Sequence, residues 1–169
     1  MALRIEPLGD HERQAFNSGN GELDRWFRER AGQDQRRNLA RVFVAVDDAG
    51  VAGFYSLSSF AIALEGLSAD LQRKLPRYPL IPAVLIGRLA RDERWRGRGL
   101  GELLLADALK RIITASRTVA VFAVVVDAAD TAAASFYTRM GFAPTPGAPL
   151  RLTLPLATAV RAVSLTRDD

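Results

Sequence analysis

Cysteine is absent from this chain, and its absence removes several kinds of chemistry. Without thiols there is no disulfide framework, no thiolate metal cluster and no cysteine nucleophile. Any transfer of an acyl group must therefore be direct or use a different residue.

Histidine and long apolar runs are also scarce. His11 is the only histidine, and it lies in a polar stretch without an obvious partner, so we expect a solvated or hydrogen-bonded residue and no metal site. No stretch approaches the roughly 18 uninterrupted apolar residues of a membrane span, and the first residues do not resemble a signal peptide. The sequence therefore predicts a cytoplasmic protein that does not contact membranes.

Lysine is scarce as well, because Lys74 and Lys110 are the only lysines among 23 basic residues. The other basic residues are arginines, and the formal net charge of the chain is +4. Because the planar guanidinium group suits bidentate phosphate contacts, one interpretation is a polyanionic partner. The other is genome composition, which can also favour arginine.

The composition predicts one folded domain over residues 1–169. Hydrophobic residues make up 49% and charged residues 25% of the chain, the ordinary balance of a globular protein. A chain of this length buries roughly two-thirds of its unfolded surface in a single core. Strand-like and helix-like segments alternate along it, so we expect an α/β or α+β domain.

The N-terminal part of the chain predicts a strand, a helix and a hairpin. A strand is expected over Leu3 to Leu8. A helix is expected to begin after Asn20, a candidate cap, because apolar residues follow at helical spacing as far as Ala31. Two long strands, Arg41 to Val46 and Val51 to Ile62, are separated by a turn and should form an antiparallel pair.

Further helices and strands alternate in the rest of the chain. Three prolines between residues 76 and 82 predict an extended passage around Tyr78, of a kind that often forms the wall of a site. Gly141 stands where a left-handed helix end is expected. The expected elements are a short helix capped by Ser68, a strand over Ala83 to Ala90, a helix reaching Ser116, a strand over Val119 to Val126, a helix capped by Asp130 and a strand over Leu150 to Leu154 that Pro155 stops.

One segment between a buried strand and an amphipathic helix has the composition of a phosphate-binding loop. Its glycines remove side chains that would keep phosphate oxygens from the main chain, and they permit the positive φ angles that such a nest requires. The N-terminus of the following helix would face the same anion. The alternative is a plain glycine-rich turn, since the spacing differs from those of dinucleotide and nucleoside triphosphate loops. The segment consists of Arg96, Gly97, Arg98, Gly99, Leu100 and Gly101.

Two motifs in this chain resemble those of a known family. The motif Arg-x-x-Gly-x-Gly at residues 96–101 resembles the signature with which GNAT acetyltransferases hold the pyrophosphate of coenzyme A. The motif Ala-Ser-Phe-Tyr at residues 134–137, followed by Gly-Phe at residues 141–142, resembles a second element of that family. The resemblance extends from the first strand to Leu154.

The resemblance to this family implies a fold and a cosubstrate. The fold would be α/β (α+β), with a mixed central sheet of about six to seven strands flanked by helices. The strands at Ala83 to Ala90 and Val119 to Val126 would splay apart around the pantetheine arm of acetyl-CoA, and no metal would be needed. Asp130 departs from the asparagine of many members and is expected only to cap a helix. Contacts to acetyl-CoA would come from backbone groups of Leu89, Ala90 and Arg91 and from the loop at residues 96–101.

Tyr137 is the residue that we expect to act as a general acid. A phenol has a pKa of about 10 and a thiol one of about 8.5, so protonating the departing thiolate requires help, for instance a lowered phenol pKa. The alternative is a tyrosine that only packs in the core. No general base can be assigned; Glu65 is one candidate, and an amine of pKa near 8 needs little help.

A narrower resemblance links the chain to the GNAT toxins of bacterial toxin-antitoxin modules. Residues 16–19 (Phe-Asn-Ser-Gly), 23–26 (Leu-Asp-Arg-Trp), 87–92 and 107–109 carry it. Those enzymes acetylate the α-amino group of the amino acid on charged tRNA, so the resemblance implies an aminoacyl-tRNA substrate, a ribbon-helix-helix antitoxin and a homodimer. Phosphate contacts could come from Arg25, Arg28, Arg36, Arg37, Arg77 and Arg88.

Two other functions stay open at this point. The first is acetylation of a small-molecule amine or of a protein N-terminus, which uses the same cofactor chemistry. The second is a non-catalytic acyl-CoA-binding regulator, and the presence of Tyr137 counts against it.

Overall fold

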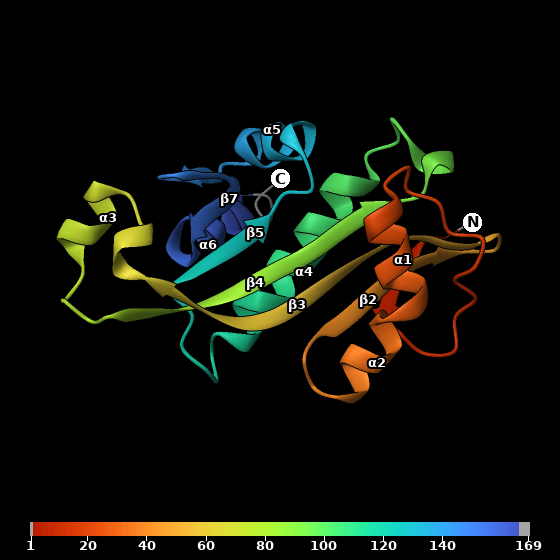
Figure 1. Ribbon diagram of the computed structural model, residues 1–169, viewed down its shortest axis with the longest axis horizontal. Helices are drawn as coiled ribbons and strands as arrows, with labels where there is room; N and C mark the ends of the chain where they lie inside the picture. The colour runs from red at the N-terminus through yellow and green to blue at the C-terminus, as the bar shows by residue number, and fades with distance from the viewer. Residues whose placement is uncertain (1, 166–169) are drawn as a thin grey trace. The chain divides into compact units, whose positions relative to one another are not determined.

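The computed structural model describes residues 2–165, and its strands form a mixed sheet in the order β1-β2-β3-β4-β5-β7-β6 (Figure 1). The chain divides into two compact units. The first holds the residues up to 58 together with residues 87–108, and the second holds residues 59–86 and the chain from residue 109 onward. Strands β3 and β4 and helix α4 contribute residues to both units.

An antiparallel meander with two covering helices forms the body of the first unit. Asn20 caps α1 as predicted, because its side chain accepts from two N–H groups of the first turn. The predicted single helix is interrupted at Arg30, whose φ of −121° is not helical, and Ala31 begins a second helix. The elements are β1 (Arg4–Pro7), α1 (Gly21–Glu29), α2 (Ala31–Arg36), β2 (Arg41–Asp47), β3 (Gly50–Ala63), β4 (Leu80–Arg91), the short turn η2 (Glu93–Trp95) and α4 (Leu100–Ala115).

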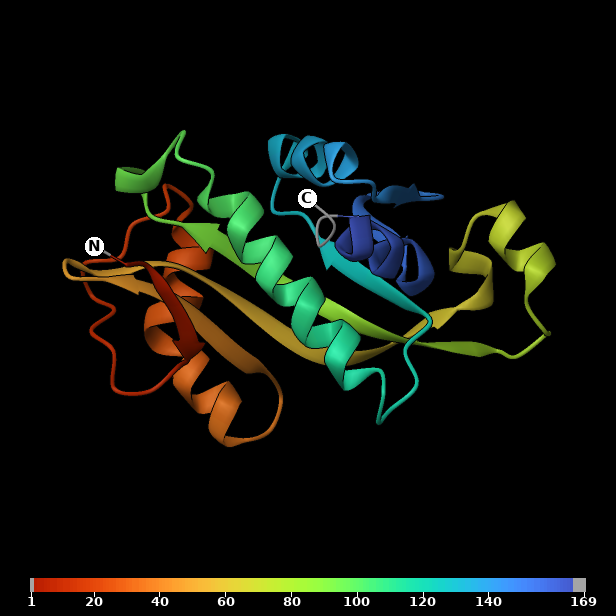
Figure 2. The ribbon, with the colours of Figure 1, turned by 180° about the vertical axis from the view of Figure 1, so that it is seen from behind.

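Strand β3 carries helices on both faces within this unit, because successive side chains of a strand point to opposite sides. Phe54 stacks on Phe27 of α1 at 4.1 Å between ring centroids. The next residue, Tyr55, donates its hydroxyl to Asp107 of α4 at 2.5 Å. A Cβ on Gly53 would lie 2.9 Å from a side-chain atom of α4, so glycine allows this close packing. Figure 2 shows α4 on the face of β3 that is turned away from α1 and α2.

A parallel strand pair forms the centre of the second unit. Residues 83–86 of β4 pair with residues 123–126 of β5, and β4 then continues to Arg91 beyond the end of this ladder. Strand β7 pairs antiparallel with β5 and with β6. The remaining elements are the turn η1 (Leu64–Gly66), α3 (Ala69–Lys74), β5 (Ala123–Asp127), α5 (Thr131–Arg139), β6 (Ala143–Thr145), β7 (Ala148–Pro155) and α6 (Leu156–Leu165).

The seven-stranded mixed sheet flanked by helices confirms the predicted fold class. The caps at Ser68 and Asp130 and the positive φ of Gly141 are also confirmed. The predicted start of β5 at Val119 is wrong; this residue is 68% exposed, and the strand begins only where the apolar run becomes buried. Helix α6 and strand β6 were not predicted, because Pro155 marks the end of β7 without showing that a helix follows.

Candidate active site

The predicted phosphate-binding loop follows β4 and leads directly into α4. Asp92 caps η2 with its side chain. The N–H of Arg96 then donates to the carbonyl of Glu93 at 3.1 Å, and the N–H of Arg98 donates to the carbonyl of Trp95 at 3.2 Å. This chain of turns sets the course of the main chain through the loop.

Two glycines of the loop adopt the left-handed conformation. The φ angle is 73° at Gly97 and 76° at Gly99, so the predicted positive φ is confirmed at these positions, whereas Gly101 lies inside α4 without it. Within residues 2–165, the N–H groups of Gly97 and Gly99 donate to no acceptor. A Cβ at either position would meet no atom within 4 Å, so there is open space beside both glycines on the side where a side chain would lie.

These features fit a pyrophosphate group. The N–H groups of the first turn of α4 have no acceptor within the helix, and the dipole of this 16-residue helix gives its N-terminus a partial positive charge. Together with the N–H groups of Gly97 and Gly99, they form an anion-binding arrangement of the kind found at helix N-termini.

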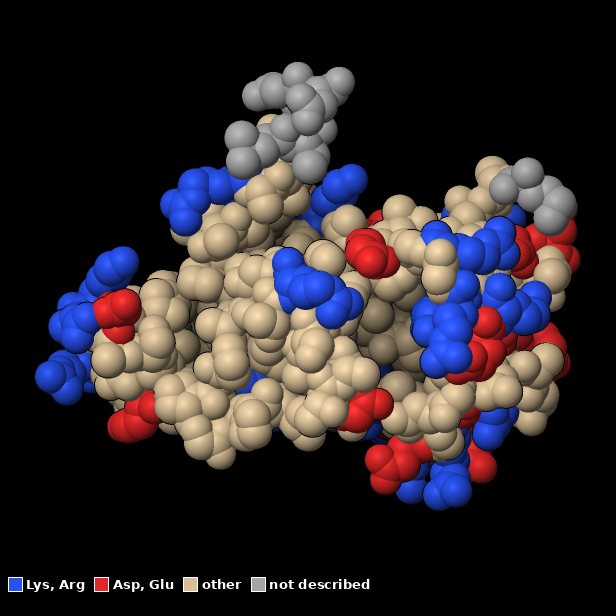
Figure 3. Space-filling view, turned by 90° about the horizontal axis from the view of Figure 1, so that it is seen from above, with Lys and Arg blue, Asp and Glu red and all other residues tan. Residues whose placement is uncertain are grey.

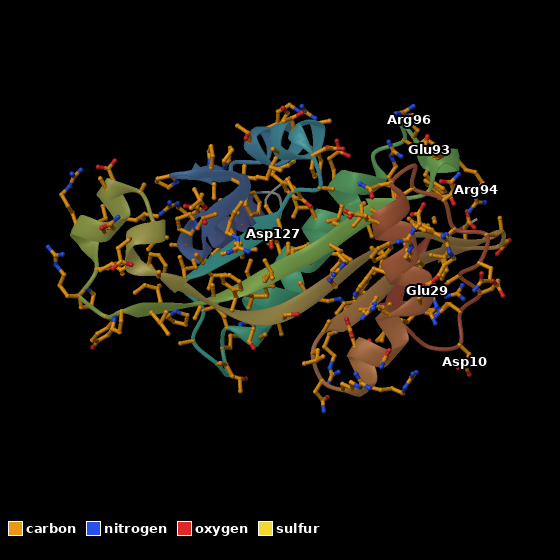
Figure 4. The ribbon with its side chains drawn as sticks, viewed as in Figure 1. Asp10, Glu29, Glu93, Arg94, Arg96 and Asp127 are labelled. Atoms are coloured by element: carbon orange, nitrogen blue, oxygen red, sulfur yellow. The ribbon has the colours of Figure 1, made fainter. Side chains whose placement is uncertain are left out.

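The arginines of the loop are held only by weak surface contacts. The guanidinium of Arg98 stacks on Trp95 with 3.8 Å to the ring centroid. Arg96 is 73% exposed and lies 3.8 Å from Glu93, so it can turn toward an anion at little cost. Figure 4 labels Glu93, Arg94 and Arg96, whose side chains surround the η2 turn. Basic and acidic side chains alternate on this side of the protein, at the right of Figure 3.

The last residues of β4 present their main chain to two different sides. The N–H groups of Arg88 and Asp92 both bond to atoms of β3. Alternation along a strand therefore turns the main chain of Ala90 toward β3 as well, and the side chain of Ala90 is buried in the core with α1. Leu89 and Arg91 turn their N–H and C=O groups to the opposite edge of β4.

Tyr137 lies on α5 in the second unit, between two other aromatic rings. Its ring contacts Phe136 at 5.2 Å and Phe142 at 5.6 Å in edge-to-face geometry, and the residue is 4% exposed. Its hydroxyl makes no hydrogen bond within residues 2–165. No side-chain oxygen or nitrogen in this range is both fully buried and without a hydrogen bond, so the hydroxyl must be in contact with solvent. Burial raises the pKa of this phenol, opposite to the lowering that the sequence argument invoked.

The predicted site residues are distributed over the two units. The residues predicted to bind the cofactor, at positions 89–91 and 96–101, all belong to the first unit, and Tyr137 belongs to the second. Glu65 lies exposed on η1, and no contact marks it as a base. The side chain of Asp130 accepts from the N–H of Ala133 at 2.8 Å, which is the predicted cap.

Polar contacts between distant segments are the part that sequence reasoning missed. His11 is not one of these cases, because it is hydrogen-bonded to residues near it in the sequence, one of the two states expected: it contacts Glu6 at 2.8 Å and accepts from the N–H of Gly9 at 3.0 Å. The buried carboxylates of Asp24 and Asp92 fasten the segment before α1 to the turn after β4. The only signal for these contacts was turn chemistry, because the run Asn-Ser-Gly-Asn at residues 17–20 favours side-chain bonds to the backbone.

Two kinds of feature are missing from the described part of the chain. Within residues 2–165, no three side chains of His, Asp or Glu are grouped so that they could hold a metal ion. No helix in the same range is long and apolar enough to cross a membrane.

Comparison with known proteins defines the family. The model of the acetyltransferase (GNAT) domain matches residues 38–144. The probable toxin TacT of Sinorhizobium fredii is 34% identical over 165 residues, which is 91% of this chain and 91% of that protein. The tRNA-acetylating toxin of Mycobacterium tuberculosis is 36% identical over 140 residues, or 83% of each chain. The chain belongs to the GNAT acetyltransferase family, and the predicted family and enzyme class are confirmed.

Solved structures agree over nearly the whole chain. AtaT complexed with acetyl-methionyl-tRNAfMet superposes with a TM-score of 0.85 at 28% identity, covering 98% of this chain and 99% of the other. A mutant AtaT toxin bound to the C-terminus of the antitoxin AtaR and acetyl-CoA gives a TM-score of 0.84 at 26% identity, covering 97% and 99%.

Proposed function

We propose that this acetyltransferase transfers the acetyl group of acetyl-CoA to the α-amino group of the amino acid on charged tRNA, and so stops translation as the toxin of a toxin-antitoxin pair. The observation that carries the proposal is the similarity, over most of the chain, to a tRNA-acetylating toxin and to AtaT complexed with acetyl-methionyl-tRNAfMet. Acetyl-CoA supplies an acetyl group already activated as a thioester.

The loop at residues 96–101 holds the pyrophosphate of acetyl-CoA. Support comes from the unpaired N–H groups of Gly97 and Gly99, the open space beside these two glycines and the N-terminus of α4. The opposite edge of β4 supplies main-chain groups of Leu89 and Arg91 for the pantetheine arm. Ala90 supports this edge from the core instead of contacting the arm with its own N–H.

Tyr137 provides the proton that the departing thiolate takes up. Burial raises the pKa of the phenol, so the Oη atom keeps its proton until the thiolate departs. Because a raised pKa opposes the transfer of that proton, the proposal requires that the bound substrates lower the pKa during the reaction. Because solvent reaches this hydroxyl, the phenol can be protonated again after each turnover. The incoming α-amine has a pKa near 8, so a useful fraction is already neutral and no general base is required.

Exposed arginines supply contacts to the phosphates of tRNA. Arg25, Arg36, Arg37 and Arg77 are all exposed, and phosphate contacts of this kind make affinity depend steeply on salt. At the left of Figure 3, the end that carries α3 is mostly basic. The other two predicted arginines have internal contacts: Arg28 donates to the carbonyl of Phe16, and Arg88 stacks on Trp26.

The proposal extends to assembly and location. The toxin acts in the cytoplasm as one domain and as a homodimer, and a ribbon-helix-helix antitoxin neutralises it. The antitoxin-bound toxin among the solved structures supports the existence of such a partner. A small open reading frame with a ribbon-helix-helix pattern beside the gene is the corresponding genomic observation.

A cell-free translation system tests the proposal. Adding the protein together with acetyl-CoA should stop peptide synthesis, and adding either component alone should not. Acetylation of polyamines or peptides is assayed in parallel with the same preparation. If those amines are acetylated readily and translation continues, the substrate is a small amine or a protein N-terminus.

A further inference from the structure

The segment before α1 is fastened to the turn after β4. The N–H of Asn17 donates to Asp92 at 3.1 Å, and the carbonyl of Asn17 accepts from the N–H of Glu93 at 2.9 Å. Gly19 lies against the carboxylate of Glu93 so closely that a Cβ on this glycine would collide with Oε1. Three contacts therefore join residues that are more than 70 positions apart in the sequence.

Asp24 of α1 holds this segment from the other side. The carboxylate of Asp24 is 5% exposed, and both of its oxygens accept from the N–H of Ser18, at 3.1 and 3.2 Å. The hydroxyl of Ser18 donates to the same carboxylate at 2.6 Å and accepts from the N–H of Asn20 at 3.1 Å. These contacts tie the segment from residue 17 to residue 20 to α1.

The turn that receives this segment is the one that begins the anion-binding loop. Asp92 caps η2 through the N–H of Arg94 at 2.9 Å, and Glu93 accepts from the N–H of Arg96. The orientation of the N–H groups at Gly97 and Gly99 follows from this turn, because no hydrogen bond of their own fixes them within residues 2–165.

We infer that Asp24, Ser18 and Gly19 are positioning residues for the pyrophosphate of acetyl-CoA. They act through Asp92 and Glu93, and they do not touch the cosubstrate. This inference rests on the proposed role of the loop at residues 96–101, and it gives a function to Ser18, Gly19 and Asp24, which belong to the motifs at residues 16–19 and 23–26 and have none in the proposal above.

The test compares two acetyl donors that differ in the pyrophosphate. Acetyl-CoA carries it, and S-acetylpantetheine has the same thioester arm without it. We expect Asp24→Ala and Ser18→Ala to weaken acetyl-CoA binding in calorimetry by about tenfold, since unmade hydrogen bonds to a buried carboxylate cost this much. The kcat/KM with S-acetylpantetheine should stay within about twofold of wild type, and kcat at saturating acetyl-CoA should be unchanged.

Matched variants separate positioning from loss of structure. Asp34→Ala removes a carboxylate from the neighbouring helix α2, where it accepts from Trp26 at 3.0 Å and does not contact the segment at residues 17–20, so acetyl-CoA affinity should not change. Asp24→Asn keeps one oxygen acceptor and should recover part of the affinity. The ratio of the two kcat/KM values does not depend on the folded fraction. If Asp24→Ala fails to fold, Gly19→Ala gives the same test through the displaced Glu93.

Two results would overturn the inference. One is wild-type affinity for acetyl-CoA in both Asp24→Ala and Ser18→Ala. The other is an equal loss of activity with both donors, which would mean that the segment only stabilises the protein. Failure of the proposed function has a different signature, because the wild-type protein would then leave charged tRNA unmodified while calorimetry still reported binding of acetyl-CoA.

Discussion

Deleting the hydroxyl of Tyr137 should abolish turnover and leave the fold intact. The phenol oxygen makes no hydrogen bond within residues 2–165, so Tyr137→Phe breaks no internal contact, and both aromatic neighbours keep their partner ring. We expect the free energy of unfolding to change by less than about 0.5 kcal/mol. Loss of a general acid typically slows a reaction by about 10²- to 10⁴-fold, which is roughly 3 to 5 kcal/mol of barrier.

The assay measures CoA release with charged tRNA as acceptor, together with acetyl-CoA affinity by calorimetry. Tyr55→Phe is the matched control, because this buried tyrosine donates to Asp107 at 2.5 Å. Its loss should lower stability by about 1.5 to 3 kcal/mol without a comparable loss of turnover in the folded protein. A Tyr137→Phe enzyme that keeps more than about a tenth of wild-type turnover would refute the general-acid role, because the effect would be too small.

Three further variants test the loop at residues 96–101, the cap of the η2 turn and the cap of helix α5. Gly99→Glu should weaken acetyl-CoA binding in calorimetry by more than about tenfold, since it places a negative side chain in the proposed phosphate space. Gly147→Glu is the control, because Gly147 has a similar φ of 77° and similar open space; its affinity for acetyl-CoA should be unchanged. Burial raises the pKa of Asp92, but hydrogen bonds from backbone N–H groups and from Arg94 outweigh it, so the folded pKa is lowered. The stability that ionised Asp92 contributes is thus present above the pKa of the unfolded state and is lost as the pH falls through the pKa of the folded state. In urea unfolding, the free energies of wild type and Asp92→Asn should therefore become equal as the pH is lowered. A difference in free energy that does not change with pH would contradict this. Asp130→Ala should lower the free energy of urea unfolding by about 1 kcal/mol through loss of the α5 cap, and an unchanged midpoint would show that the cap contributes nothing.

The conformation of the loop at residues 96–101 could be predicted because its determinants are local. Glycine spacing, a preceding buried strand and a following amphipathic helix all lie within one stretch of sequence, and the positive φ angles at Gly97 and Gly99 agree with that interpretation. The expected contact between the main chain of Ala90 and acetyl-CoA depends on more than local sequence. Which residues of β4 turn their main chain to which edge depends on pairing with β3, and sequence periodicity does not reveal the neighbour of a strand.

Contacts between distant segments could not be predicted for the same reason. Nothing near Asp92 in the sequence indicates that Asn17 will donate to it, or that Asp24 will be buried against Ser18. The raised pKa of Tyr137 also depends on tertiary burial, in which the ring of Phe142 takes part. Helix caps were predicted well, since a cap needs only its own first turn.

The most direct test of the central claim is mass spectrometry of the 3′-terminal nucleoside of tRNA. Bulk charged tRNA is incubated with the protein and acetyl-CoA, digested with ribonuclease, and examined for the aminoacyl ester of adenosine. The account predicts that at least one aminoacyl-adenosine becomes heavier by one acetyl group on its amine, and that deacylated tRNA is unchanged. Aminoacyl-adenosines that all keep a free amine, from a protein that binds acetyl-CoA, would contradict it.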